Sequence, residues 1–323
     1  MNPILALIVA NVIWGAASPI FKFAFTNIPP FTLAFLRFFL AGLIFVPFCI
    51  GHWQKLTLRQ WLELMLVAFF GISLNISFYF IGLETTQSIN APIIASSAPI
   101  IIYALSIVFL GEKPKSKKTF GMLISLLGVL VIIFSPFFFG GQRMVLGEIK
   151  GNILIFISNI GAVLQTLFGK DSLKKINAYQ ASLITFLAGS LFFIPYMGTE
   201  LKTWSFSQLN SAGLIGIVFG VVLCSALAYF LFYYGLSKID AGDAGIFTYI
   251  DPVAAVVIAI PLLHEYPDLF YFLGSFLVFG GIYLAEGRIH WHPFHLLKKM
   301  EKNVGAIDKK ILVRLAELAN KNN

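Results

Sequence analysis

Apolar residues fill ten stretches of the chain, each about 20 residues long and separated by short polar segments. They are, approximately, 3–25, 31–50, 62–83, 90–110, 118–137, 150–170, 178–197, 212–236, 243–263 and 270–288. A helix of about 20 apolar residues crosses the roughly 30 Å hydrocarbon core of a bilayer. None of the stretches alternates with a period of two, which argues against a membrane barrel. The pattern predicts an all-α integral membrane protein with ten transmembrane helices.

The first stretch has a second interpretation, because Ala16-Ala17-Ser18 resembles the cleavage site of a signal peptide. No basic residue precedes it, its length suits a span, and it has a counterpart at 150–170. We therefore expect a retained helix.

A pattern of glycine, proline and polar residues within and between the apolar stretches occurs twice, at an offset of about 153 residues. The matched pairs are Gly82/Gly235, Leu83/Leu236, Asn90/Asp243, Pro99/Pro252, Glu112/Glu265, Pro114/Pro267, Gly121/Gly274 and Gly128/Gly281. Nearer the N-terminus an offset of 147 to 148 pairs Asn11 with Asn159 and Lys22 with Lys170. Such self-similarity indicates an internal duplication. Because five spans are an odd number, the second copy enters the membrane from the opposite side, which predicts two inverted five-helix repeats, 3–137 and 150–288.

Composition and charge agree with this prediction. The chain is 58% apolar and 12% charged, with a net charge of +8, whereas about a quarter of the residues in a soluble protein are charged. Eighteen Lys and Arg residues fall on one side of the predicted spans and three on the other. Because cations favour the cytoplasmic side, we expect both termini in the cytoplasm of a bacterium and the helices in its inner (plasma) membrane. The cations lie in loops and a tail, so the basic balance indicates no nucleic-acid partner.

Two charges lie deep within predicted spans, where they are costly and need a reason. Asp251 precedes Pro252, which frees the carbonyl of Thr248, so a carboxylate and an unpaired acceptor meet in one turn. This turn could hold an ammonium group or a proton. The alternatives are an ion pair with Arg37 or a carboxylate that faces a water-filled cavity.

Pro99 is the counterpart of Pro252 and lies beside Ser96, without a charge. Both prolines are either simple bends or the helix kinks that mark a central transport site. Other polar or aromatic residues are spaced to face the same region, although each can also serve helix packing. The candidate substrate- or proton-binding residues are Asp251, Arg37, Trp14, Asn11, Asn75, Tyr79, Ser96, Asn159, Gln165, Tyr229 and Tyr249, with Pro99 and Pro252 as kinks.

Residues outside this set have structural interpretations. Lys22 and Lys170 are close enough to the ends of their helices to reach water, and Glu112 and Glu265 act as helix stops. Small residues on the fifth and tenth spans permit close helix contact or act as a hinge. The sequence contains no catalytic, metal-binding or nucleotide-binding motif, so we expect no enzyme activity and no cofactor.

Residues 289–323 form a basic cytoplasmic tail with an amphipathic pattern that suits a helix on the membrane surface. Its three histidines, at 290, 292 and 295, stand among aromatic residues, which favours an interfacial collar over a metal site.

Together these features resemble the EamA family of the drug/metabolite transporter superfamily. The features that carry the resemblance are Trp14-Gly15, Arg37, G-L-E-T-T-Q-S-I-N-A from Gly82, Pro99, L-G-E-K-P from Leu110, and Asp251-Pro252. The resemblance covers about residues 3–288, with Glu84 and His264 as departures. It implies a central cavity lined by the first four helices of each half, and movement of amino acids, related metabolites or drugs, usually outward.

We therefore expect a secondary active transporter of a small metabolite, working by alternating access and more in the direction of export. Metabolite uptake or exchange, and lipid flipping, are the alternatives. The expected partners are a small-molecule substrate, the lipid bilayer and coupling protons, and we expect a monomer or weak homodimer.

Overall fold

The computed structural model describes residues 2–110, 113–138, 142–169, 175–236, 238 and 246–286. Within these ranges every regular element is helical and there is no strand. The predicted tail, 289–323, lies outside the described residues, as do Lys170 and Glu112.

The helices follow the predicted apolar stretches. In the first half they are α1 Pro3–Ala24, α2 Pro30–Cys49, α3 Leu58–Ala68, η1 Phe69–Leu74, α4 Asn75–Thr85, α5 Asn90–Ala95, α6 Ala98–Leu110, α7 Ser116–Phe134 and η2 Ser135–Phe138. In the second half they are α8 Gln142–Gly169, α9 Ala178–Leu191, α10 Ile194–Glu200, η3 Phe206–Gln208, α11 Ser211–Val218, η4 Phe219–Leu227, α12 Ala228–Leu236, η5 Ile246–Tyr249, α14 Ile250–Leu263 and α15 Leu269–Glu286.

Six helices of the described chain are long and apolar enough to cross a bilayer, and the pair α9 and α10, bent by 49°, makes a seventh. Three apolar segments, Asn90–Leu105, Phe247–Leu263 and Leu269–Ala285, are shorter. The protein is therefore an all-α membrane protein, and ten spans in inverted repeats stay a prediction.

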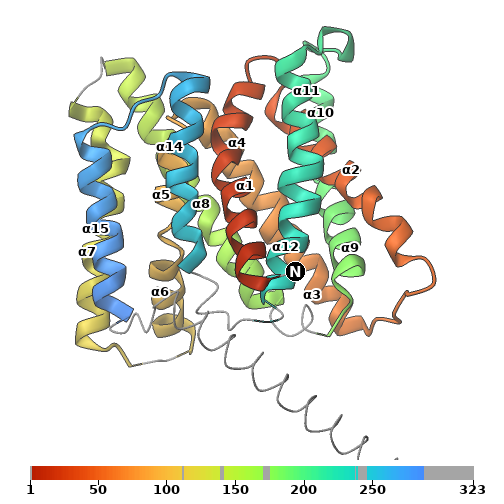
Figure 1. The fold of residues 1–323 in the computed structure, drawn as a ribbon, viewed down its shortest axis with the longest axis horizontal. Coiled ribbons are helices and arrows are strands. Elements are labelled where there is room, and N and C mark those ends of the chain that lie inside the picture. The colour runs from red at the N-terminus through yellow and green to blue at the C-terminus, as the bar shows by residue number, and fades with distance from the viewer. Residues whose placement is uncertain are drawn as a thin grey trace, which may run out of the picture.

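The helices run side by side, with α7 and α15 at one edge of the bundle and α2 and α9 at the other (Figure 1). Between these edges α1 packs against α12 and α14, while α8 packs against α4, α5 and α6. Glycine permits the closest approaches: a Cβ on Gly281 of α15 would lie 2.3 Å from the backbone nitrogen of Ser125 on α7. Close contact between small residues is a common way for helices to associate in lipid.

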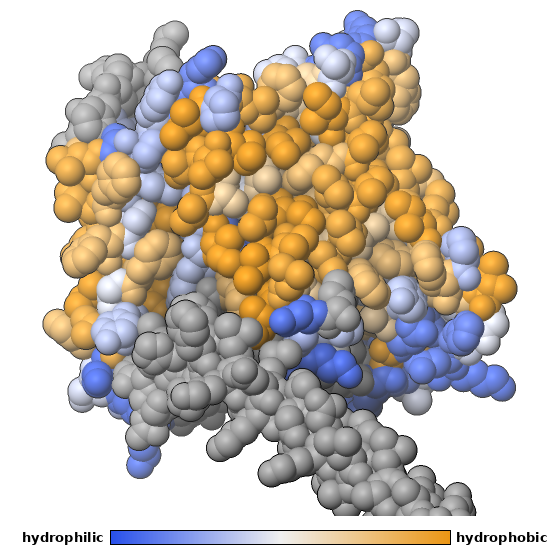
Figure 2. All heavy atoms as spheres, in the orientation of Figure 1, coloured by the Kyte–Doolittle hydropathy of each residue, from blue (hydrophilic) through white to orange (hydrophobic). Residues whose placement is uncertain are grey.

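The outer surface matches a bilayer environment. Figure 2 shows a broad hydrophobic band across the middle of one face, with hydrophilic residues gathered toward the two ends. Large apolar side chains such as Phe276, which is 76% exposed, therefore have lipid as their natural neighbour.

Two long helices contain a wide turn in mid-course. η1 continues α3 into α4, and η4 continues α11 into α12, and both are π-helical. Such turns are rare and are frequently found at functional sites.

The two prolines expected as kinks lie near the beginnings of α-helices and not in the middle of them. Pro99 lies in the first turn of α6, after an interruption at Ser96 and Ser97, and Pro252 lies in the first turn of α14, after the 3-10 turn η5. Each proline thus begins an α-helix, where its missing N–H removes no helical hydrogen bond.

Candidate functional site

Arg37 extends from α2 into the core of the bundle and is only 4% exposed. Its Nε donates to Ser225 Oγ at 2.8 Å and its Nη2 donates to Cys224 Sγ at 3.2 Å, both in η4. The guanidinium also lies 4.9 and 4.6 Å from the ring centres of Phe21 and Phe38. Within the described chain no carboxylate lies within 4.0 Å of Arg37. Its positive charge is buried without an acidic partner, an arrangement that is costly inside a membrane.

Asp251 lies in the first turn of α14. Its Oδ1 is fully buried and has no hydrogen-bond partner in the part of the chain that the structure describes. A Cβ on Gly15 would lie 2.4 Å from the Asp251 carbonyl, so α1 packs directly on this turn. The ion pair with Arg37, considered above as an alternative, does not form in this structure. Asp251 therefore has one buried carboxylate oxygen that no described residue satisfies.

Other side chains connect these two charges. Tyr79 of α4 and Cys224 of η4 each lie within electrostatic range of both Arg37 and Asp251. Trp14 of α1 donates its indole N–H to the Cys224 carbonyl at 3.1 Å. We call these five residues the central cluster; they come from α1, α2, α4, η4 and α14, and η4 packs there against α1 and α2.

Tyr229 and Asn11 border the central cluster. The Tyr229 ring packs edge-on against Trp14 with ring centres 5.3 Å apart. Asn11 is completely buried, donates to the Leu7 carbonyl at 2.8 Å, and leaves its own Oδ1 without a partner. Tyr249 lies in η5, immediately before α14, with its ring against Phe279 at 5.2 Å.

The remaining predicted residues lie along α8 and its neighbours, and most of them bind backbone. Asn75 donates to the Ser158 carbonyl at 2.7 Å, and Asn159 donates to the Ile94 carbonyl at 2.8 Å. Ser96, which follows α5, donates to the carbonyl of Pro92 in the last turn of α5 at 3.0 Å. Their hydrogen bonds favour the packing interpretation of these three residues.

Gln165 of α8 is packed over η1. A Cβ on Gly71 would lie 2.0 Å from Gln165 Cδ, so glycine at this point of η1 makes room for the amide.

The chain ends of α1 and α14 are joined by polar contacts that sequence reasoning missed. Lys22 Nζ lies 3.0 Å from Glu265 Oε1 and also donates to the Thr86 carbonyl. Glu265 Oε2 accepts from the Ser88 backbone N–H at 2.6 Å and from its hydroxyl at 2.7 Å. Lys22 and Glu265 thus link α1, α14 and the α4–α5 turn at one end of the molecule, which we call the Lys22 end.

The π-helical segments and the Cys224 and Ser225 contacts of Arg37 were also absent from the sequence prediction. Cys224 is 1% exposed, and its sulfur accepts a hydrogen bond from Arg37. The one available signal was a Cys-Ser pair in the eighth apolar stretch.

Comparison with known proteins supplies the class of activity. The model of the EamA-like transporter family matches residues 1–134 and 149–286. The chain is 31% identical over 288 residues to the uncharacterized transporter YetK of Bacillus subtilis, an alignment that covers 88% of this chain and 87% of that protein. It is 30% identical over 285 residues to an uncharacterized transporter of Archaeoglobus fulgidus, covering 88% of this chain and 99% of that one. A crystal structure with 18% identity shares the fold, with a TM-score of 0.60 over 87% of this chain and 95% of the other.

Proposed function

The chain belongs to the EamA-like transporter family, and on that premise we propose that it is a secondary active transporter of a zwitterionic metabolite, an amino acid or a related compound. We further propose that it works in the bacterial inner membrane and moves its substrate outward. The amino-acid substrate and the direction are our inferences; the class, a membrane transporter, follows from the family.

The observation that carries the substrate class is the coexistence of Arg37 and Asp251 in the central cluster. A guanidinium is suited to bind a carboxylate through two parallel hydrogen bonds, and a carboxylate is suited to bind an ammonium group. Because these two groups do not pair with each other, each is available to one end of a zwitterion. A bound zwitterion would neutralise both buried charges and so offset part of their desolvation.

Alternating access between two inverted halves is the proposed mechanism, with ten spans in all. The contacts between helices support it, because exchanging the halves reproduces them: α1 with α12 corresponds to α8 with α4, and α1 with α14 corresponds to α8 with α5 and α6. Single residues follow the same exchange. A Cβ on Gly82 would lie 2.9 Å from Ile155, and a Cβ on Gly235 would lie 2.5 Å from Leu7.

The Lys22–Glu265 link supports a state closed at the Lys22 end, which the charge distribution predicts to be the outer end. Export would then proceed from a site open to the cytoplasm, through separation of α1 from α14 at this end. In this proposal a transmembrane gradient supplies the energy for transport. Asp251 is the group that would bind either a proton or the ammonium group of the substrate, one in place of the other.

Counterflow of labelled amino acids into proteoliposomes tests the proposal. Hydrogen bonds to charged groups contribute about 1.5–3 kcal/mol, so Asp251→Asn should lower transport about ten- to a hundredfold, and Arg37→Lys should also impair it. Glu63→Gln is the matched control, because Glu63 forms an exposed pair with Arg59 at 2.7 Å, away from the central cluster.

The choice of substrates separates the two roles. Replacing the substrate's ammonium group by a hydroxyl should remove the difference between wild type and Asp251→Asn. Equal transport by wild type and both variants would refute the assignment of the central cluster. Movement of a labelled phospholipid in place of any zwitterion would favour the flippase alternative.

A further inference from the structure

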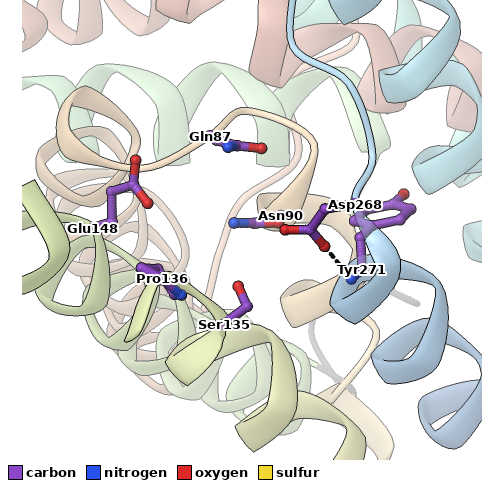
Figure 3. Close-up of a pocket in the computed structure, with 7 residues that line it drawn as sticks. All are labelled: Gln87, Asn90, Ser135, Pro136, Glu148, Asp268 and Tyr271. Atoms are coloured by element: carbon purple, nitrogen blue, oxygen red, sulfur yellow. Dashed lines mark hydrogen bonds between the residues drawn. The ribbon is translucent and has the colours of Figure 1, made fainter. Parts of the chain in front are cut away.

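A second polar site lies at the Lys22 end, separate from the central cluster. It is a pocket whose empty volume of about 330 Å³ includes open solvent, and Figure 3 shows the residues that line it. It is formed where the α4–α5 turn, η2, α8 and α15 meet, and its lining residues are Gln87, Asn90, Ser135, Pro136, Glu148, Asp268 and Tyr271. We call it the peripheral pocket.

Asn90 is the buried polar group of this pocket. It is 6% exposed, and its side chain makes no hydrogen bond within the described residues. Figure 3 shows it extending between Glu148 on one side and Asp268 on the other. The Asn90 side chain is mostly enclosed by protein, and the pocket that it lines is where its unpaired amide can be reached. A ligand in the pocket would therefore find an amide that has no competing protein partner.

The two carboxylates of the pocket also have free acceptor capacity. Glu148 of α8 has no ion pair or hydrogen bond within the described residues. Asp268 Oδ1 accepts from the Tyr271 backbone N–H in the first turn of α15 at 2.6 Å. Among the described residues its Oδ2 has no donor.

The pocket is negative because its neighbouring cation is already used. Lys22 and Glu265 both act electrostatically on Glu148, but Lys22 is held by Glu265 at 3.0 Å. The charges of Glu148 and Asp268 therefore disfavour an anion. In the described part of the chain no group of three potential ligands could hold a metal ion. An organic ammonium group fits better, since it brings positive charge and N–H donors to carboxylate and amide oxygens.

We propose that the peripheral pocket binds the ammonium group of a small organic cation or zwitterion. Glu148 and Asp268 supply the charge complement and the Asn90 carbonyl accepts a hydrogen bond. One part of this inference rests on the proposed function: we take the ligand to be the transported metabolite, bound at the Lys22 end on its way between water and the central cluster. Binding itself requires no transport.

The test measures n-butylammonium binding to the purified full-length protein by calorimetric titration. It is carried out in an Asp251→Asn background, which removes the carboxylate of the central cluster. We expect n-butylammonium to bind, with n-butanol and butyrate binding at least tenfold more weakly. Glu148→Gln and Asp268→Asn should each weaken n-butylammonium binding about tenfold or more, and Asn90→Ala should weaken it less. Glu63→Gln should leave it unchanged.

These variants are chosen to preserve the fold. Asp268→Asn keeps a side-chain acceptor for the Tyr271 N–H, and melting temperature without ligand reports folding for each variant. If Glu148→Gln fails to fold, Glu148→Asp replaces it in the test. This variant keeps the negative charge on a shorter side chain and should bind n-butylammonium less tightly than the protein with Glu148.

Three results would overturn the proposal: no binding in the Asp251→Asn background, equal binding of n-butanol, or affinity unchanged by both Glu148→Gln and Asp268→Asn. The proposed function can fail separately from this proposal. In that case the wild type would show no amino-acid counterflow but would still bind n-butylammonium.

Discussion

The contact between α7 and α15 allows a prediction that compares two adjacent glycines. A Cβ on Gly281 would lie 2.3 Å from Ser125 N, 2.5 Å from Gly121 O and 2.8 Å from Ser125 Cα. All three are backbone atoms, so no rotamer change relieves the contact and the helices must separate. Apart from its own helix, no described residue lies within 4 Å of the place that a Cβ on Gly280 would take.

The magnitudes follow from this difference. Either substitution removes the flexibility of a glycine in a helix, which stabilises by about 0.5–1 kcal/mol. Gly281→Ala also forces extra carbon into a packed interface, which costs about 1–3 kcal/mol. Because the first contribution is common to both, the two variants should differ by about 1–3 kcal/mol in the free energy of unfolding.

Thermal unfolding in detergent, followed by tryptophan fluorescence and by the fraction of protein that remains monodisperse, measures the difference. We expect Gly281→Ala to melt several degrees below Gly280→Ala. A further variant locates the cause: a Cβ on Gly274 would lie 2.4 Å from the side-chain Cγ1 of Ile132, so Ile132→Ala should partly rescue Gly274→Ala. Equal melting of Gly280→Ala and Gly281→Ala would refute the close packing of α7 on α15.

Two other predictions concern α14. Gly15→Ala would place a Cβ 2.4 Å from the Asp251 carbonyl, so it should displace the first turn of α14 and reduce amino-acid counterflow more than it lowers the melting temperature; a parallel loss of both would contradict this. His264 ends α14 with φ 55° and ψ 32°, a left-handed conformation that costs a non-glycine residue about 1–2 kcal/mol, so His264→Gly should raise the melting temperature, and a lower one would show that the imidazole itself stabilises this end.

Hydropathy located the helices because the bilayer imposes a length and a composition on each crossing, whatever the neighbours. The close contact of Gly121, Gly128, Gly274 and Gly281 was also predictable, since small residues at helical spacing in lipid serve packing. The structure confirms this contact: a Cβ added to Gly128 would meet the backbone of Gly274, and a Cβ added to Gly121 would meet the backbone of Gly281.

The candidate site was less predictable because it depends on how each helix is rotated about its axis. Arg37 and Ser225 are 188 residues apart in sequence yet hydrogen-bonded at 2.8 Å. Asn75 and Asn159 are, like Asn11, asparagines within apolar stretches, but their amides donate to carbonyls of neighbouring helices. The peripheral pocket combines side chains from several elements, and no single motif announces it.

The two π-helical turns bear on the history of the chain. η1 ends at Leu74 and η4 ends at Leu227, 153 residues further on, the same offset that pairs Gly82 with Gly235. A π turn is an α-helix that has taken in an extra residue, an event that is costly for the packing of everything beyond it. On the proposed duplication, one insertion before the gene was copied accounts for both turns. The ancestor in this proposal is a half-length membrane protein that already carried the wide turn and assembled in pairs of opposite orientation.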